Sequence, residues 1–116
     1  MLREAEIFKV LSDATRLRLT ALLAAGGETC VCKLAMALDE PDYKISRHLG
    51  VLRSAGLVGA RRKGSWMYYR LLEGRGPLEK YLQGLFRDCL GNHKIARKDL
   101  GRLEKIPCRE EGEICG

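Results

Sequence analysis

Two cysteines separated by one residue, Cys30 and Cys32, have the type and spacing that most directly suggest chemistry in this sequence. Thiolates are soft ligands, which prefer Zn(II), Cd(II), Pb(II), Cu(I) or As(III) to Mg(II) or Ca(II). The pair stands in ETCVCKL, at the start of an expected helix, where unpaired backbone N–H groups favour a negatively charged ligand atom. We interpret the pair as part of a site for a soft ion; the alternative is that both side chains are small buried hydrophobes.

The pair is incomplete as a site, because two ligands do not fill a trigonal or tetrahedral coordination shell. Cys89 falls on an apolar helical stripe, so we expect it to be buried in the core or in an interface. Cys108 and Cys115 lie in a polar tail, which can deliver a ligand at low cost. Our hypothesis is a three-thiolate site from Cys30, Cys32 and one tail cysteine of the same or the partner subunit.

The elements that position these thiols can be read from apolar spacing and from turn residues. We expect a short helix at 4–11, a second that is capped by Ser12 or Asp13 and stops at Gly26-Gly27, and two short helices at about 31–38 and 43–55. β-prone runs at 57–61 and 66–71 predict a hairpin, and Pro77 begins a further helix that carries an apolar stripe to residue 89. A last helical stretch covers about 95–103. The sequence therefore predicts one mainly helical domain over 1–106 and a flexible cysteine-containing tail over 107–116.

Positive charge is concentrated in one part of the chain. The formal net charge is +6, and residues 41–72 hold seven basic groups against one acidic group. A local excess of this kind suggests an anionic partner.

The order of helices followed by a hairpin is that of a winged helix-turn-helix, whose second helix enters the major groove of DNA. The expected DNA-contacting residues lie on that helix and on the hairpin tip; they are Tyr43, Lys44, Ser46, Arg47, His48, Arg53, Arg61, Arg62 and Lys63. For His48, which also falls on the apolar stripe, a packing role remains open. For the whole set, the alternative is a solvated helix face.

Three segments resemble the ArsR/SmtB family of bacterial metal-responsive transcriptional repressors: SDATRLRLTALL, ETCVCKLAMAL and YKISRHLGVLRSAGLVGARRKGSWMYYRL. The resemblance runs from about residue 4 to 90, and its C-V-C and K-I-S-R-H-L segments are most similar to the arsenic/antimony and cadmium/lead branch. It implies a homodimer that binds a palindromic operator and leaves it when metal binds. It also implies a dimer interface formed by the N-terminal helix and the helix after the hairpin, including Leu78, Tyr81, Leu82, Leu85, Phe86 and Cys89.

Neither set of metal ligands known for the family is complete in this chain. The arsenic branch often has a third cysteine three positions after the second, where this chain has Ala35. The cadmium/lead branch takes ligands from an N-terminal arm, but residues 1–29 contain no cysteine. Some members carry a second, zinc-type site on the last helices. Asp88, His93 and Asp99 are present here without the histidine pair, so we expect no such site.

Within a regular helix, residues i and i+2 point about 200° apart, so both sulfurs reach one ion only if the first turn lies outside the helix or unwinds. We therefore expect ligation to strain the first helix of the DNA-binding pair. By linkage, that strain would weaken DNA binding.

The expected function is a repressor that responds to As(III) or Sb(III), with sensing of Cd(II), Pb(II) or Zn(II), or of thiol oxidation, as alternatives. An enzyme is not expected, because a thiol reductase would need C-x-x-C beside a β-α-β unit. A winged-helix protein that bridges other proteins is a third interpretation. No apolar run reaches 18 residues and the N-terminus is charged, so we expect a cytoplasmic protein with no membrane partner and no small-molecule substrate.

Overall fold

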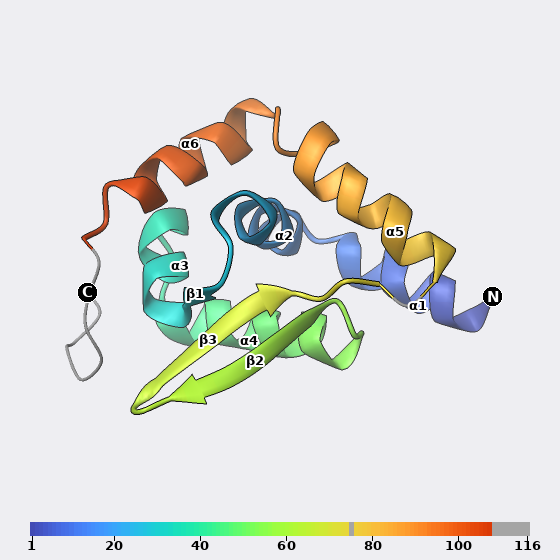
Figure 1. The fold of residues 1–116 in the computed structure, drawn as a ribbon, viewed down its shortest axis with the longest axis horizontal. Helices are drawn as coiled ribbons and strands as arrows, with labels where there is room; N and C mark the ends of the chain where they lie inside the picture. The colour runs from blue at the N-terminus through green and yellow to red at the C-terminus, as the bar shows by residue number, and fades with distance from the viewer. Residues whose placement is uncertain (75, 108–116) are drawn as a thin grey trace.

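The computed structural model describes residues 1–74 and 76–107 of the chain. The helices within these ranges are α1 (Leu2–Leu11), α2 (Ala14–Gly26), α3 (Val31–Leu38), α4 (Asp42–Ser54), α5 (Pro77–Gly84), the π-helix η1 (Leu85–Cys89) and α6 (Lys94–Glu104). The strands are β1 (Thr29–Cys30), β2 (Val58–Lys63) and β3 (Trp66–Leu71). Figure 1 shows α5 and α6 arching over α2, with α3 beneath α6 and with α4 and the β2–β3 hairpin on the far side of α2. This arrangement is a winged helix-turn-helix, which confirms the predicted fold class.

Local signals in the sequence set the ends of the second helix. Asp13 is the N-cap of α2, and its carboxylate accepts a hydrogen bond from the backbone N–H of Arg16 at 3.0 Å. Gly27 ends the helix with a φ of 76°, a left-handed value that side chains rarely adopt. Asp13 is therefore the cap rather than Ser12, and the predicted stop at Gly26-Gly27 is confirmed.

The wing, defined here as strands β2 and β3 with their turn, is longer than the sequence indicates. The two strands pair antiparallel from Val58 opposite Leu71 to Lys63 opposite Trp66. Gly64, with a φ of 62°, and Ser65 form the two-residue turn. The first β-run was predicted to end at residue 61, which is too early, because Arg62 and Lys63 belong to β2.

Strand β1 was not predicted. Thr29 pairs with Tyr69 and Cys30 with Tyr68, so β1 adds a third strand to the wing in the order β1-β3-β2. A two-residue strand has no periodicity of its own, and its backbone becomes a strand only when β3 is beside it. The first of the two cysteines is thereby part of the wing sheet.

The segment after the wing departs from a regular helix. The N–H of Leu90 donates to the carbonyl of Leu85 at 2.8 Å, which is the i to i+5 bond of a π-turn. Leu82 and Phe86 point into the core of their own chain, while Tyr81 is 79% exposed and Leu85 is at the surface. The apolar stripe predicted from Leu78 to Cys89 therefore divides between the core and the outer face.

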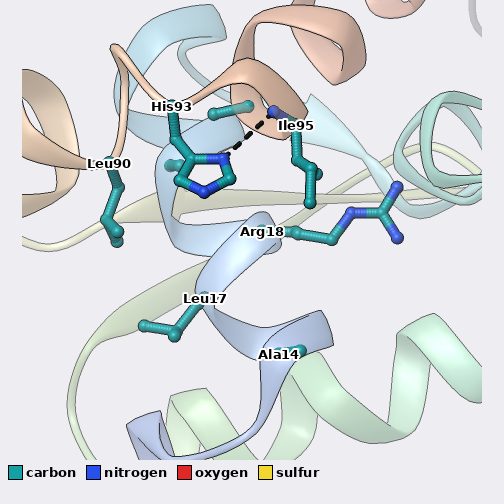
Figure 2. Close-up of a pocket in the computed structure, with 8 residues that line it drawn as sticks. Ala14, Leu17, Arg18, Leu90, His93 and Ile95 are labelled. Atoms are coloured by element: carbon teal, nitrogen blue, oxygen red, sulfur yellow. Dashed lines mark hydrogen bonds between the residues drawn. The ribbon is translucent and has the colours of Figure 1, made fainter.

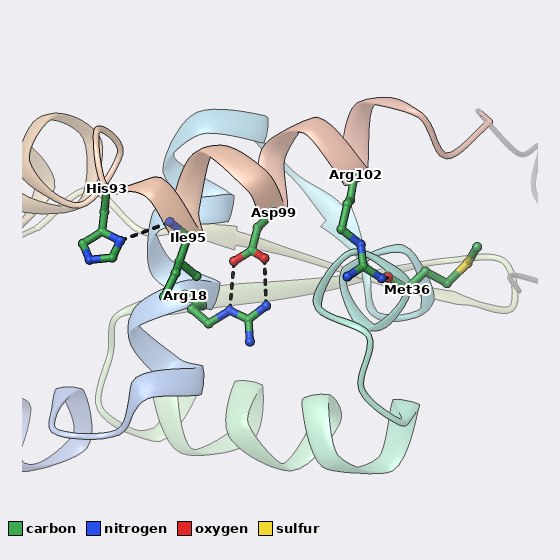
Figure 3. A network of polar contacts seen from close by, with 6 residues as sticks. All are labelled: Arg18, Met36, His93, Ile95, Asp99 and Arg102. Atoms are coloured by element: carbon green, nitrogen blue, oxygen red, sulfur yellow. Dashed lines mark hydrogen bonds and ion pairs between the residues drawn. The ribbon is translucent and has the colours of Figure 1, made fainter.

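Helix α6 is held against the rest of the domain by polar contacts (Figure 3). The Arg18 guanidinium donates from Nε to Asp99 Oδ2 at 3.0 Å and from Nη2 to Asp99 Oδ1 at 2.8 Å, and Asp99 is 1% exposed. This hydrogen-bonded carboxylate raises the pKa of Arg18. Arg102 donates to the carbonyl of Met36 at 3.1 Å, so the end of α6 lies beside α3.

Apolar side chains from α2, α3 and α4 make the centre of the core, including Leu19, Leu22, Leu34, Ile45 and Leu49, each at most 1% exposed. No helix in the described part of the chain is both long and apolar enough to span a bilayer.

Candidate thiol site and nucleic-acid interface

The two cysteine sulfurs lie side by side at the junction of the wing sheet and α3. Cys30 is the N-cap of α3, with extended backbone angles (φ −78°, ψ 156°), and Cys32 lies in the first turn of the helix. Their Sγ atoms are 3.2 Å apart, and each residue is 5% exposed. The pair therefore forms one sulfur-rich corner rather than two separate packing groups.

This geometry corrects the expectation of helix strain. Because Cys30 belongs to β1, its backbone precedes the helix, and its side chain is not subject to the 100° step that separates helical neighbours. Both sulfurs reach a common point without any unwinding of α3. A ligand at this corner therefore acts on the contact between α3 and the sheet, not by breaking the first turn of α3.

The third ligand proposed from the sequence is a tail cysteine, Cys108 or Cys115. Over 1–74 and 76–107, no three His, Cys, Asp or Glu side chains gather closely enough to hold a metal ion. Cys108 and Cys115 lie outside the described residues. Helix α6 ends beside α3, the helix that carries Cys32, as the bond from Arg102 to the carbonyl of Met36 and Figure 1 show.

Cys89 does not join the thiol corner. It ends η1 and is exposed, so the expectation that it packs in the core of the chain is wrong. Its expected place in an interface stays a prediction.

The second helix of the pair, α4, presents a polar outer face. Ile45, Leu49 and Leu52 are buried against the core. Tyr43 is 72% exposed, and the other exposed members of the predicted DNA-contacting set on this helix are Ser46, Arg47 and Arg53. Arg62 and Lys63 are exposed near the wing turn. Two separate surfaces, one helical and one on the hairpin, therefore present donors for phosphates and base edges.

Two of the predicted DNA-contacting cations are already paired with carboxylates. Lys44 Nζ lies 3.1 Å from both carboxylate oxygens of Glu40. Arg61 donates from Nη2 to Glu28 Oε1 at 2.7 Å and from Nε at 2.9 and 3.0 Å to the two oxygens. The Arg61 hydrogen bonds lower the pKa of Glu28, with Arg70 and Lys63 adding to the effect. Both cations would have to exchange a partner to contact DNA.

His48 lies on the inner side of α4. It is 9% exposed, and its Nδ1 is 3.1 Å from Arg16 Nη1, so the ring accepts a hydrogen bond from a guanidinium that can only donate. Burial lowers the pKa of His48, and the nearby Arg16, Arg47 and Lys44 act in the same direction, while Asp13 raises it. The neutral ring joins α4 to the start of α2. In this structure His48 therefore has the packing position that the sequence left open as an alternative to DNA contact.

A pocket of about 330 Å³ separates the thiol corner from α4 and the wing tip. Its walls come from α3, from the first turns of α4 and from the wing; they are Val31, Cys32, Asp42, Tyr43, Ser46, Ser65, Trp66 and Met67. Cys32 therefore faces the same hollow as two of the predicted DNA-contacting side chains, Tyr43 and Ser46.

A second pocket, of about 200 Å³, lies between α2 and the start of α6 (Figure 2). On its wall, His93 Nδ1 accepts from the backbone N–H of Ile95 at 3.1 Å and so caps α6. Asp88 pairs with its neighbour Arg87 at 3.3 Å, and Asp99 is bound to Arg18. Asp88, His93 and Asp99 thus each have a separate structural contact.

Helices α1 and α5 expose apolar side chains side by side. Arg3 of α1 forms an ion pair with Glu79 of α5, and Figure 1 shows the two helices adjacent. Phe8 on α1 is 55% exposed, and Tyr81 and Leu85 are exposed after the wing. Of the six residues expected in a dimer interface, Leu82 and Phe86 are instead covered by their own chain, whereas Leu78 is half-buried.

Residues 13–59 match the family described as "Bacterial regulatory protein, arsR family". Over 71 residues the chain is 54% identical to the arsenic resistance transcriptional regulator ArsR2 of Pseudomonas putida, covering 61% of this chain and 62% of that protein. It is 45% identical over 73 residues to an HTH-type transcriptional regulator of Methanocaldococcus jannaschii, covering 63% of this chain and 82% of that protein. The chain spans about half to three fifths of the length of two Pseudomonas putida arsenic resistance regulators and of the Escherichia coli arsenical resistance operon repressor.

The fold is also that of a solved structure, a possible transcriptional regulatory protein from Mycobacterium bovis. The two have a TM-score of 0.61 and 33% sequence identity, over 78% of this chain and 92% of that one. With a helix-turn-helix, a basic wing and these relatives, the chain belongs to the ArsR family of bacterial regulatory proteins.

Proposed function

We propose that this protein is a transcriptional repressor that binds a palindromic operator as a homodimer and is released when As(III) or Sb(III) binds its thiolates. The ligands are Cys30, Cys32 and one tail cysteine, Cys108 or Cys115, of the same or the partner subunit. The observation that carries the proposal is the 3.2 Å separation of the two Sγ atoms at the start of the helix-turn-helix.

The sulfur separation favours a pyramidal ion over a tetrahedral one. With metal–sulfur bonds of about 2.3 Å, a tetrahedral zinc ion holds two thiolate sulfurs about 3.8 Å apart. At bonds of that length, a sulfur separation of 3.2 Å corresponds to a sulfur–ion–sulfur angle of about 90°. Trivalent arsenic and antimony carry a lone pair that pushes their three bonds toward such angles. The similarity to an arsenic resistance transcriptional regulator of Pseudomonas putida supports the same choice.

The DNA half of the proposal rests on the exposed donors of α4 and the wing. Tyr43, Ser46, Arg47 and Arg53 occupy one side of α4, and Arg62 and Lys63 extend the basic surface along the hairpin. A surface with this many cations binds phosphates with a steep dependence on salt. The exposed apolar side chains of α1 and α5 support a homodimer, since a two-fold dimer would cover them and repeat α4 for two half-sites.

The test is release from a labelled duplex that repeated rounds of binding have selected from random sequences, followed by fluorescence anisotropy. As(III), Sb(III), Cd(II), Pb(II), Zn(II) and hydrogen peroxide are titrated separately. We expect As(III) and Sb(III) to release the duplex at the lowest concentrations. Release by Cd(II), Pb(II) or Zn(II) alone, or by peroxide alone, would replace the proposed inducer with one of the alternatives.

Cysteine variants locate the ligands in the same assay. Cys30→Ser and Cys32→Ser should abolish the response to As(III), and Cys89→Ser is the matched control that keeps it. Cys108→Ser and Cys115→Ser are compared for ligand affinity and stoichiometry. If both tail variants bind As(III) as the unmodified protein does, the tail-ligand part of the proposal is wrong.

A further inference from the structure

One row of paired residues crosses the wing sheet from the thiol corner to a basic side chain. Cys30 of β1 is opposite Tyr68 of β3, and Tyr68 is opposite Arg61 of β2. Residues that are directly opposite in a sheet share one face, and the Arg61 guanidinium carbon lies 5.7 Å from the centre of the Tyr68 ring. The thiol residue and Arg61 are therefore two steps apart across a single sheet.

Glu28, which precedes β1, connects the same segment of chain to Arg61 by hydrogen bonds. It stands two residues before Cys30, in the bend that leads into β1. From there it reaches Arg61, with Nη2 to Oε1 at 2.7 Å. The segment that carries the first thiol thus also carries the carboxylate that holds a wing cation.

The ion pair is weak enough to be exchanged. The side chain of Glu28 is 26% exposed and that of Arg61 is 53% exposed, and pairs at such sites contribute little because water and salt screen them. A DNA phosphate offers Arg61 the same two-oxygen acceptor geometry as a carboxylate. While Glu28 holds Arg61, however, the pair carries no net charge toward DNA.

We propose that Glu28 is a positioning residue for operator binding: Arg61 pairs with Glu28 when the protein is off DNA and with a phosphate when it is on DNA, and an ion at the thiol corner favours the Glu28-bound arrangement. This inference rests on the proposed function, since it assigns the route by which ligand binding weakens the operator complex.

The short length of β1 offers a physical reason why an ion at the thiol corner would favour the pairing of Arg61 with Glu28. Strand pairing holds the segment that carries Glu28 only at Thr29 and Cys30, the two residues of β1. An ion bound to both sulfurs would restrain Cys30 further and so restrict the motion of Glu28, two residues before it. The pair then loses less entropy when it forms, and Arg61 is less available to a phosphate.

The chain contains a matched control for this exchange. Glu40 holds Lys44, another predicted DNA-contacting cation, at 3.1 Å, and its side chain is 25% exposed. Glu40 lies between α3 and α4 and is not part of β1. Removing either carboxylate frees one cation and changes the net charge equally, but only Glu28 is attached to the strand of the thiol.

The experiment measures operator affinity, its salt dependence and its weakening by As(III) for the unmodified protein, Glu28→Gln and Glu40→Gln. Both variants should bind the duplex about two- to fivefold more tightly, because one ion pair no longer competes with DNA. Both should steepen the slope of log K against log[salt] by about one unit. The factor by which As(III) weakens binding should fall about two- to fivefold in Glu28→Gln and stay unchanged in Glu40→Gln.

Arg61→Gln separates the pair from a general charge effect. In that background, Glu28→Gln should change neither operator affinity nor the response to As(III). A gain in affinity that persists without Arg61, or an equal loss of response in Glu28→Gln and Glu40→Gln, would overturn the inference.

The outcomes also separate this inference from the function on which it rests. If none of the ions releases the unmodified protein, the proposed function fails and the coupling fails with it. If As(III) releases the unmodified protein and Glu28→Gln to the same extent, the proposed function stands and Glu28 is not the route.

Discussion

The Cα atoms of Cys30 and Tyr68 are direct partners in the antiparallel pairing of β1 with β3. This pairing makes the first cysteine part of the wing sheet, while Cys32 belongs to α3. An ion that bridges the two sulfurs would therefore join the sheet to the first helix of the helix-turn-helix. The two elements expected to touch DNA are the neighbours of that junction, so an ion bound there would act next to both of them.

The buried ion pair between Arg18 and Asp99 should be a main support for α6. We expect Asp99→Ala to lower the free energy of unfolding by about 1–3 kcal/mol, less than for a fully buried pair because the Arg18 side chain is 30% exposed. Urea unfolding followed by circular dichroism measures the change. Asp88→Ala removes a carboxylate from an exposed pair and should change the unfolding free energy by less than about 0.5 kcal/mol. Equal losses in both variants would contradict this assignment.

Protonation of His48 should destabilise the fold. Burial holds the folded-state pKa of His48 below its ordinary value of 6.5, so the unfolded chain binds the proton more readily than the folded one. Stability is therefore fully present above about 6.5 and falls as the pH drops through that value toward the lower folded pKa. Urea unfolding between pH 7.5 and 5.5 should show this loss, and His48→Gln should reduce it. An identical pH dependence in His48→Gln would assign the loss to other groups.

Two glycines should respond in opposite directions to alanine. Gly56 follows α4 with a φ of 79°, so Gly56→Ala should cost about 1–2 kcal/mol of unfolding free energy through backbone strain. Gly101 lies inside α6, and an added Cβ meets no atom within 4 Å there. Gly101→Ala should therefore raise the unfolding free energy by about 0.5–1 kcal/mol. Thermal and urea unfolding check both changes, and a stabilising Gly56→Ala would contradict the turn assignment.

The outer face of α5 and the inner face should have different roles. Tyr81→Lys places a charge on an exposed position and should weaken the proposed dimer without unfolding the chain, as sedimentation equilibrium would show. Tyr43→Lys, at a comparably exposed position on α4, is the control and should leave the oligomeric state unchanged. Leu82→Ala should instead lower the unfolding free energy by about 2–5 kcal/mol, because Leu82 is in the core. A dimer that is insensitive to Tyr81→Lys would place the interface elsewhere.

The sequence by itself determined the order of elements and several of their ends. A cap at Ser12 or Asp13 and a stop at Gly26-Gly27 bounded α2, and the apolar spacing of Ile45, Leu49 and Leu52 placed α4 with the correct face inward. These features depend on residues within a few positions of one another, so the local sequence contains the physical cause: a cap, a left-handed glycine or a 3.6-residue repeat. The helix-turn-helix and the wing follow from the same local patterns.

The tertiary structure decided how residues far apart in the chain meet. Cys30 became a strand residue because β3 lies beside it, and this brought its sulfur to 3.2 Å from that of Cys32. The π-turn after α5 determines which apolar side chains of this segment face inward. The ion pair between Arg18 and Asp99 joins residues that are 81 positions apart in the chain. Each of these contacts depends on packing between separate elements, whose partners no local spacing specifies. The cysteine spacing indicated a thiol site, and the fold of the sheet against α3 determined its geometry.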